Sequence, residues 1–286
     1  MFSQRMQLAL LFVTLWVLAL DAKVVVAEPG AASAQGPATI EAGYRQMYNL
    51  DFEGAHQTFQ SWELTYPEDP LGPASNAAAY LFAEFARLHI LESELFTDDD
   101  KFARRDRLTP DPVIQTAFES ELKKAEQMAD QNLSHAPGDH RALFAKVLAG
   151  GLRGDYTALI EKKNLAALSS MKLSRSMAER LLAEDPSYYD AYLAVGVENY
   201  LLGTNPAPVR WLLHLTGAQT DKGDGLTKLQ LTAEKGRYLA PFARLLLAVA
   251  ALRDHDRNKA RNLLTGLAQE FPQNPLYRRE LDRIAP

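Results

Sequence analysis

The stretch "ARLLLAVAALRDHDRNKARNLLTGLAQEFPQNP", residues 243–275, decides the fold class of this chain. Apolar residues recur at helical spacing on both sides of the polar turn "RDHDR", and Pro272 follows the second run. This pattern predicts two helices joined as an antiparallel hairpin. The unit holds no obvious nucleophile, metal cluster or phosphate loop, so its residues indicate packing.

The same spacing of small and large side chains occurs elsewhere in the chain. In the opening hairpin it is carried by Ala248, Ala260, Leu264, Leu267 and Pro272. In the stretch 49–70, "NLDFEGAHQTFQSWELTYPEDP", the same offsets hold Ala55, Phe59, Trp62 and Pro67. A small residue lets two helices approach closely, and a large one four residues later fills the space beside it. The proline then ends the hairpin.

This spacing resembles the tetratricopeptide repeat family, whose units of about 34 residues contain two helices each. Residues 241–272 match the family pattern well, 36–67 match it fairly, and the units near 140 and 189 match only in their first helix. The resemblance implies an array of helical hairpins. Residues 188–247 also resemble exported bacterial tetratricopeptide proteins of unassigned role, through an aromatic-Asn helix, Arg210-Trp211, and the Lys-Gly-Arg-Tyr corner at 235–238.

Two middle segments are longer than the family's helices. Residues 111–135 hold one apolar stripe, and residues 155–185 read as a second long helix after a Gly-Asp turn at 154–155. Sustained alternation typical of strands is absent. The predicted fold class is therefore all-α, a tetratricopeptide-like helical-hairpin array (α-solenoid) that is irregular in the middle. The segment "NPLYRRELDRI", residues 274–284, is expected to be its C-terminal capping helix.

The N-terminal residues predict export. An apolar run, Leu8–Leu20, follows the basic residue Arg5 and precedes small residues, as in a secretory signal peptide covering 1–27. An uncleaved membrane anchor is the alternative, but the run is shorter than the roughly 20 residues that a spanning helix needs. Residues 28–38 read as a flexible linker and 39–286 as the repeat domain. We therefore expect a periplasmic or extracellular protein, with membrane contact only through an uncleaved signal.

Composition narrows the functional classes. The chain has 286 residues, is 47% hydrophobic and carries a formal net charge of −5, which argues against a nucleic-acid partner. It contains no cysteine, so disulfides and thiolate zinc sites are excluded. The common hydrolase, metalloprotease and phosphate-loop motifs are absent. We expect no catalytic residue, cofactor or metal, and hence no enzyme; an enzyme with a site of unfamiliar type is a third alternative to the two functions below.

The tetratricopeptide resemblance implies a concave surface, lined by the first helix of each pair, that holds a protein segment. Asn199 could bind the backbone of such a partner, because its amide both donates and accepts. Tyrosines on this surface could instead be packing residues with a wet hydroxyl. The register with the family places eight residues there: Tyr44, Leu193, Val197, Asn199, Tyr200, Phe242, Leu245 and Val249.

Two functions are carried forward from the sequence. The first is a non-enzymatic exported adaptor that binds an unidentified protein or peptide of the cell envelope. The second is a carrier or sensor of a lipid or other small apolar ligand between the long middle helices, with Met128, Met171 and Met177 lining the site. A deep apolar cavity would favour the second function over the first.

Overall fold

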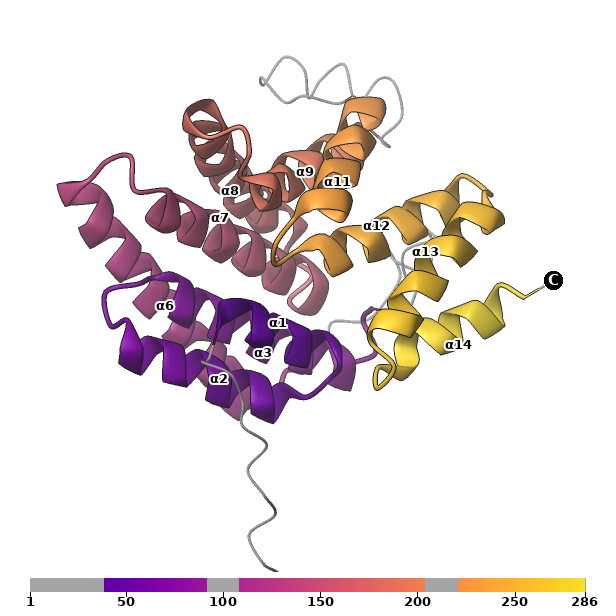
Figure 1. The fold of residues 1–286 in the computed structure, drawn as a ribbon, viewed down its shortest axis with the longest axis horizontal. Helices are drawn as coiled ribbons and strands as arrows, with labels where there is room; N and C mark the ends of the chain where they lie inside the picture. The colour runs from indigo at the N-terminus through magenta and orange to yellow at the C-terminus, as the bar shows by residue number, and fades with distance from the viewer. Residues whose placement is uncertain (1–38, 92–107, 204–220, 286) are drawn as a thin grey trace, which may run out of the picture. The chain divides into compact units, whose positions relative to one another are not determined.

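The computed structural model describes residues 39–91, 108–203 and 221–285 (Figure 1). These ranges contain eleven α-helices and no strand. The all-α prediction is confirmed for this part of the chain, and neighbouring helices pack in contact. The predicted signal segment 1–27, the linker 28–38 and the pair Arg210-Trp211 lie outside the described residues. Within the described ranges, no helix is both long and apolar enough to cross a bilayer.

The first three helices are α1 (Ile40–Tyr48), α2 (Phe52–Thr65) and α3 (Leu71–Arg87). Ala55 and Phe59, the small and large positions of the predicted hairpin, are both fully buried on α2. Thr39 and Asp51 accept hydrogen bonds from the first turns of α1 and α2, which fixes where each helix begins. The α2 helix ends two residues before Pro67, as the sequence predicts.

The middle of the chain differs from its prediction in one place. Helix α6 (Pro112–His135) is the expected long helix, with Asp111 as its N-cap. The expected Gly-Asp turn and single helix over 155–185 are wrong, because α7 (His140–Asp155) runs through both residues. A π-helical turn, η1 (Tyr156–Ile160), follows, and α8 (Asn164–Glu184) begins only after Lys162 has turned the chain through a left-handed backbone conformation.

The helices α9 (Tyr192–Gly203) and α11 (Lys222–Lys235) approach one another closely. Two glycines allow this contact: a Cβ atom on Gly225 would lie 2.6 Å from the backbone nitrogen of Tyr200 and 2.9 Å from the carbonyl oxygen of Gly196. Because no side chain separates the two backbones, their register is fixed tightly. A short 3₁₀ turn, η2 (Tyr189–Ala191), precedes α9.

The hairpin of the opening stretch is confirmed. It consists of α12 (Ala240–Arg253) and α13 (Arg257–Glu270), joined by a turn at His255, and its pattern residues Ala248, Ala260, Leu264 and Leu267 are buried. The predicted C-terminal helix is α14 (Pro275–Arg283), with Asn274 as its N-cap.

The first helix contacts the last hairpin, as the indigo and yellow segments of Figure 1 show. The Tyr48 hydroxyl donates to the carbonyl oxygen of Tyr238 at 3.2 Å, and the Asn274 side chain donates to the carbonyl oxygen of Tyr48 at 2.9 Å. Arg45 and Arg244 both form ion pairs with Glu270, on α13. In an open solenoid each repeat contacts only its neighbours, so this seam between α1 and the C-terminal helices is a departure from that pattern.

Candidate functional site

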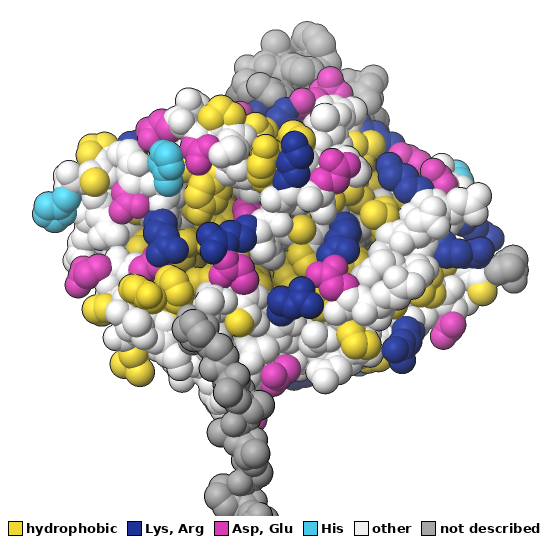
Figure 2. Space-filling view, viewed as in Figure 1, with side chains coloured by type: hydrophobic (Ala, Val, Ile, Leu, Met, Phe, Trp, Pro, Cys, Tyr) yellow, Lys and Arg dark blue, Asp and Glu magenta, His cyan; other side chains and the backbone are white. Residues whose placement is uncertain are grey.

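A cavity of about 390 Å³ lies among the helices, and its walls come from nearly the whole described chain. Its lining residues belong to α1, α3, α7, η1, α8, η2, α9, α11 and α12, together with Leu91 and Leu239. Apolar side chains dominate this lining. Figure 2 shows apolar side chains in the middle of one face, with charged side chains interspersed around them.

Seven of the eight predicted groove residues line this cavity. They come from three helices that are distant in sequence, and they are Tyr44, Leu193, Val197, Tyr200, Phe242, Leu245 and Val249. Tyr44 and Tyr200 are buried, at 2% and 9% exposure, so their rings serve as packing surface. The register therefore identifies the inward-facing side of these helices, while contact with a protein partner stays a prediction.

Aromatic rings form one wall of the cavity. The Phe82 ring meets those of Tyr48 and Phe242 edge-on, with centroids 6.0 and 5.3 Å away. Tyr44 lies beside Tyr48, with 6.2 Å between centroids. The seam between α1 and the C-terminal helices thus contributes to the cavity wall, because Tyr44 lies beside Tyr238 and Tyr48 lies beside both Phe82 of α3 and Phe271. A smaller pocket of about 70 Å³ adjoins this wall and shares Tyr48, Phe82 and Phe242 with it.

Two carboxylates line the cavity, and Asp190 is the one with partners. Its oxygens accept hydrogen bonds from the backbone N–H groups of Arg237, Tyr238 and Leu239, at 2.8 to 3.0 Å. Burial raises the pKa of Asp190, and these three donors lower it in part. The Lys-Gly-Arg-Tyr corner of the sequence is therefore a cap on Asp190: a Cβ atom at Gly236 would lie 2.9 Å from one carboxylate oxygen.

The second carboxylate, Asp155, has no such partners. It is the last residue of α7, directly before the π-helical turn, and π-helical turns are frequent at functional sites. Its side chain is reachable from the cavity but otherwise surrounded by protein, and burial raises its pKa to about 7. Among the described residues, none forms a hydrogen bond or ion pair with this carboxylate.

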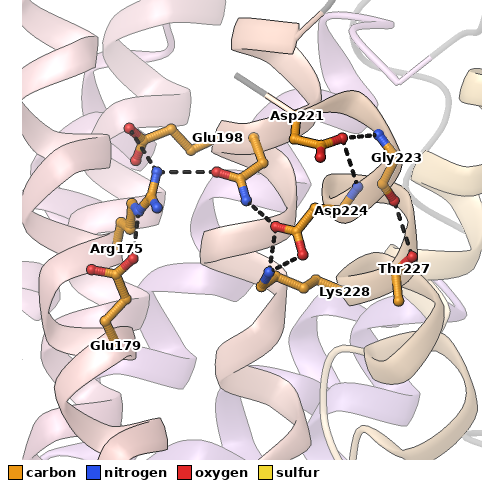
Figure 3. Close-up of polar contacts among 9 residues, drawn as sticks. Arg175, Glu179, Glu198, Asp221, Gly223, Asp224, Thr227 and Lys228 are labelled. Atoms are coloured by element: carbon orange, nitrogen blue, oxygen red, sulfur yellow. Dashed lines mark hydrogen bonds and ion pairs between the residues drawn. The ribbon is translucent and has the colours of Figure 1, made fainter. Parts of the chain in front are cut away.

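A chain of polar side chains crosses α8, α9 and α11 beside the cavity (Figure 3). Arg175 donates to the Asn199 side-chain oxygen at 3.0 Å and to Glu179 at 2.8 Å, and lies 3.5 Å from Glu198. The Asn199 amide nitrogen donates to Asp224 at 2.6 Å, and Asp224 pairs with Lys228. Burial raises the pKa of Glu198, which Arg175 lowers in part.

This network uses the eighth predicted groove residue. Asn199 is fully buried and does not line the cavity, because its amide oxygen is bound by Arg175 and its amide nitrogen binds Asp224. The amide that the sequence offered to a partner's backbone thus joins three helices of the same domain. Its predicted role in partner binding has no support from this position.

The predicted methionine lining is only partly matched. Met171, on α8, lines the cavity, while Met177 packs against the core without reaching it. Met128 is half-buried on α6, and no residue of α6 is among the lining residues, because this helix packs on the outer side of α3 and α7. The cavity therefore lies inside the helices from α1 to α12, with α7 and α8 as its middle walls.

Other titratable groups cluster away from the cavity. On α2, α3 and α6, Glu63 pairs with Lys124, and burial beside Glu63 raises the pKa of Glu121 to about 7. His140 lies 3.5 Å from Glu184 and 3.8 Å from Asp185. Across the described ranges, no group of three or more His, Cys, Asp or Glu side chains is arranged to hold a metal ion.

Comparison with protein-family models, with curated proteins and with solved structures finds no match to this chain.

Sequence reasoning missed Asp155 and the rings of α3. Asp155 follows three glycines, at 150, 151 and 154, and the sequence pattern predicts a turn at 154–155. The glycines instead allow α8 to pack closely on α7. A Cβ atom at Gly150 would lie 2.9 Å from the Cβ atom of Ser174, and one at Gly154 would lie 3.2 Å from the Met171 side chain. The sequence pattern that could have identified Asp155 is a glycine-rich helix face that ends in an acidic residue among apolar ones.

Proposed function

We propose that this domain binds a small apolar ligand in its interior cavity, as a carrier or sensor, and that it catalyses no reaction. The observation that carries the proposal is the cavity of about 390 Å³ with its mainly apolar lining. Small-molecule sites typically measure about 300–1,000 Å³ and combine apolar walls with a few polar groups.

A pair of matched glycine substitutions tests this proposal. Gly151 lines the cavity, and a Cβ atom added there meets only the Ser174 hydroxyl oxygen, at 3.8 Å. Gly151→Leu therefore fills cavity space without a clash against backbone. Gly266 lies on α13, away from the cavity, and a Cβ atom there meets nothing within 4 Å. Gly266→Leu is thus the same substitution in a helix, with no effect on the cavity.

The experiment measures binding of the neutral apolar dye Nile red and its displacement by 1-dodecanol. We expect saturable binding to the purified domain, a loss of about ten-fold or more in affinity for Gly151→Leu, and no change for Gly266→Leu. Circular dichroism checks that both variants keep their helices. Equal binding by the two variants, or no binding by the wild type, would contradict the proposal.

An adaptor function is the second candidate, and the observation that favours it is that seven predicted groove residues share one lining. On this proposal a protein segment of the cell envelope inserts apolar side chains between α1 and α12. Crosslinking of the tagged protein in its native envelope would then recover one partner in stoichiometric amount, and Gly151→Leu would lose it. In both proposals the protein is exported, as the predicted signal peptide at residues 1–27 implies.

A further inference from the structure

The polar groups of the cavity define the chemistry of its ligand. Asp190 is held by three backbone donors, and Arg253 already interacts with another residue. Asp155 is different, because no described residue satisfies its carboxylate although protein surrounds it. Buried polar groups are nearly always hydrogen-bonded, and an ionised carboxylate without a partner is especially costly. Asp155 is therefore the one carboxylate among the described lining residues without a partner, and a carboxylate accepts from a hydrogen-bond donor or pairs with a cation. Among the same residues the Tyr44 hydroxyl also has no partner, but it is neutral and makes no demand for a cation.

The position of Asp155 in its helix strengthens the demand for a cation. Helix α7 continues into the π-helical turn η1, so Asp155 lies towards the C-terminal, negative end of this continuous helical stretch, where cations are favoured and anions are not. The nearby α8 residues on the lining, Ala167, Leu168, Met171 and Ser174, bring no positive charge. A ligand with a protonated amine would supply the missing charge and up to three N–H donors.

The size of the cavity limits the rest of the ligand. An apolar protein cavity of about 150 Å³ holds benzene, which has six non-hydrogen atoms. By proportion, 390 Å³ holds a ligand of about 15 non-hydrogen atoms. The remaining walls are aliphatic and aromatic, including Leu193, Phe242 and Val249, so the body of the ligand must be apolar. A single amine at one end of a chain of about twelve carbons meets both conditions.

We propose that the cavity selects amine-bearing amphiphiles, with the protonated amine on the Asp155 carboxylate and the apolar chain among the aromatic and aliphatic walls. This proposal depends on the proposed function, since it assigns a ligand class to the same cavity. Arg253 would favour a fatty acid instead, but it lies on the lining with an interaction already made, whereas Asp155 has none.

The test compares three ligands that share one chain and differ in their head group. Dodecylamine, 1-dodecanol and lauric acid each displace Nile red from the wild-type protein and from Asp155→Asn at pH 8, below their aggregation concentrations. For the wild type we expect dodecylamine to bind about ten-fold or more tightly than dodecanol, and lauric acid to bind most weakly. Asp155→Asn should lose this preference, so that dodecylamine and dodecanol bind it with affinities within about two-fold of one another.

The outcomes separate the two proposals. If dodecanol or lauric acid binds the wild type as tightly as dodecylamine, the amine proposal fails and the apolar-ligand proposal stands. A preference for the amine that persists in Asp155→Asn would also overturn it. If Nile red does not bind and no ligand shifts the thermal midpoint, the apolar-ligand proposal fails as well. The comparison of the three ligands on the wild-type protein needs no variant, so it tests the amine proposal even if Asp155→Asn folds poorly.

Discussion

Two sets of buried polar groups lie among the same helices and have opposite surroundings. Around Arg175, side chains of α8, α9 and α11 bind one another in a continuous chain through Asn199 to Asp224. Asp155, at the end of α7, has no hydrogen-bond partner in the part of the chain that the structure describes. Folding normally pairs what it buries, so the first set is explained by helix packing. The second is a carboxylate that faces the cavity, and it is the group to which we assign the amine of the proposed ligand.

Removing Arg175 should have the largest effect. Arg175→Met leaves Glu198, which is 3% exposed, without its cation, and it takes a donor from Asn199. Breaking a buried ion pair on one side costs about 3–5 kcal/mol. We expect urea denaturation to show a loss of that size. Because the cost comes from leaving the Glu198 carboxylate unpaired, adding Glu198→Gln to Arg175→Met should recover part of the lost stability. If Arg175→Met alone is as stable as the wild type, the network does not stabilise the fold.

Asp155→Asn should have the next largest effect, and one that depends on pH. The pKa of Asp155 is raised by burial from its ordinary value near 4 to about 7 in the folded state. The protonated form therefore stabilises the fold, this contribution is complete below about pH 4, and it is lost as pH rises through 7. At ~1.4 kcal/mol per pH unit, the wild type should lose up to about 4 kcal/mol relative to Asp155→Asn across this window.

The measurement for Asp155 is the difference in unfolding free energy between wild type and Asp155→Asn at pH 4, 5.5, 7 and 8.5. Asp190, Arg253 and the cavity tyrosines are present in both proteins, so their own titration largely cancels. A difference that stays constant over this range would show that Asp155 has a partner in solution. In that case both the comparison and the amine proposal would need revision.

Lys228 should have the smallest effect, because it lies at the exposed end of the Arg175 network. Its side chain and that of Asp224 are 22% and 38% exposed, so water compensates when the pair is lost. For Lys228→Ala we expect a loss of at most about 1 kcal/mol, weaker still at high salt. A loss as large as that of Arg175→Met would mean that the network stabilises as one unit, without a gradient from its buried to its exposed end.

The parts of this fold that the sequence predicted are those set by short spacings. Ala55 with Phe59 and Ala260 with Leu264 lie four residues apart, so one helix turn is enough to place them. The same helical register identified the inward side of α9 and α12, and so the part of the cavity lining that these two helices supply. The seam could not be found this way, because Tyr48 meets Tyr238 and Asn274 across 190 and 226 residues.

The errors at Asn199 and Asp155 have one cause. Whether a polar side chain is free depends on what other helices bring to it, and no local pattern records that. Asn199 seemed available but is bound from α8 and α11. Asp155 was expected in a Gly-Asp turn, but α7 continues through it and into a π-helical turn. Composition and spacing predicted the helices; the pairing of buried polar atoms required their positions in space.

The seam between α1 and the C-terminal helices also has a consequence for the order of events in folding. Helix α1 is made near the beginning of the chain, yet the groups that hold Tyr48, on Tyr238 and Asn274, are made near its end. Contacts between such distant residues form late in folding, after the loop-closure entropy has been overcome. Until then Tyr44 and Tyr48 have only their contacts within the N-terminal helices, with Phe59 of α2 and Phe82 of α3, and the wall that α12 contributes is absent. Ligand binding would therefore report that the whole domain, from α1 to α14, has finished folding.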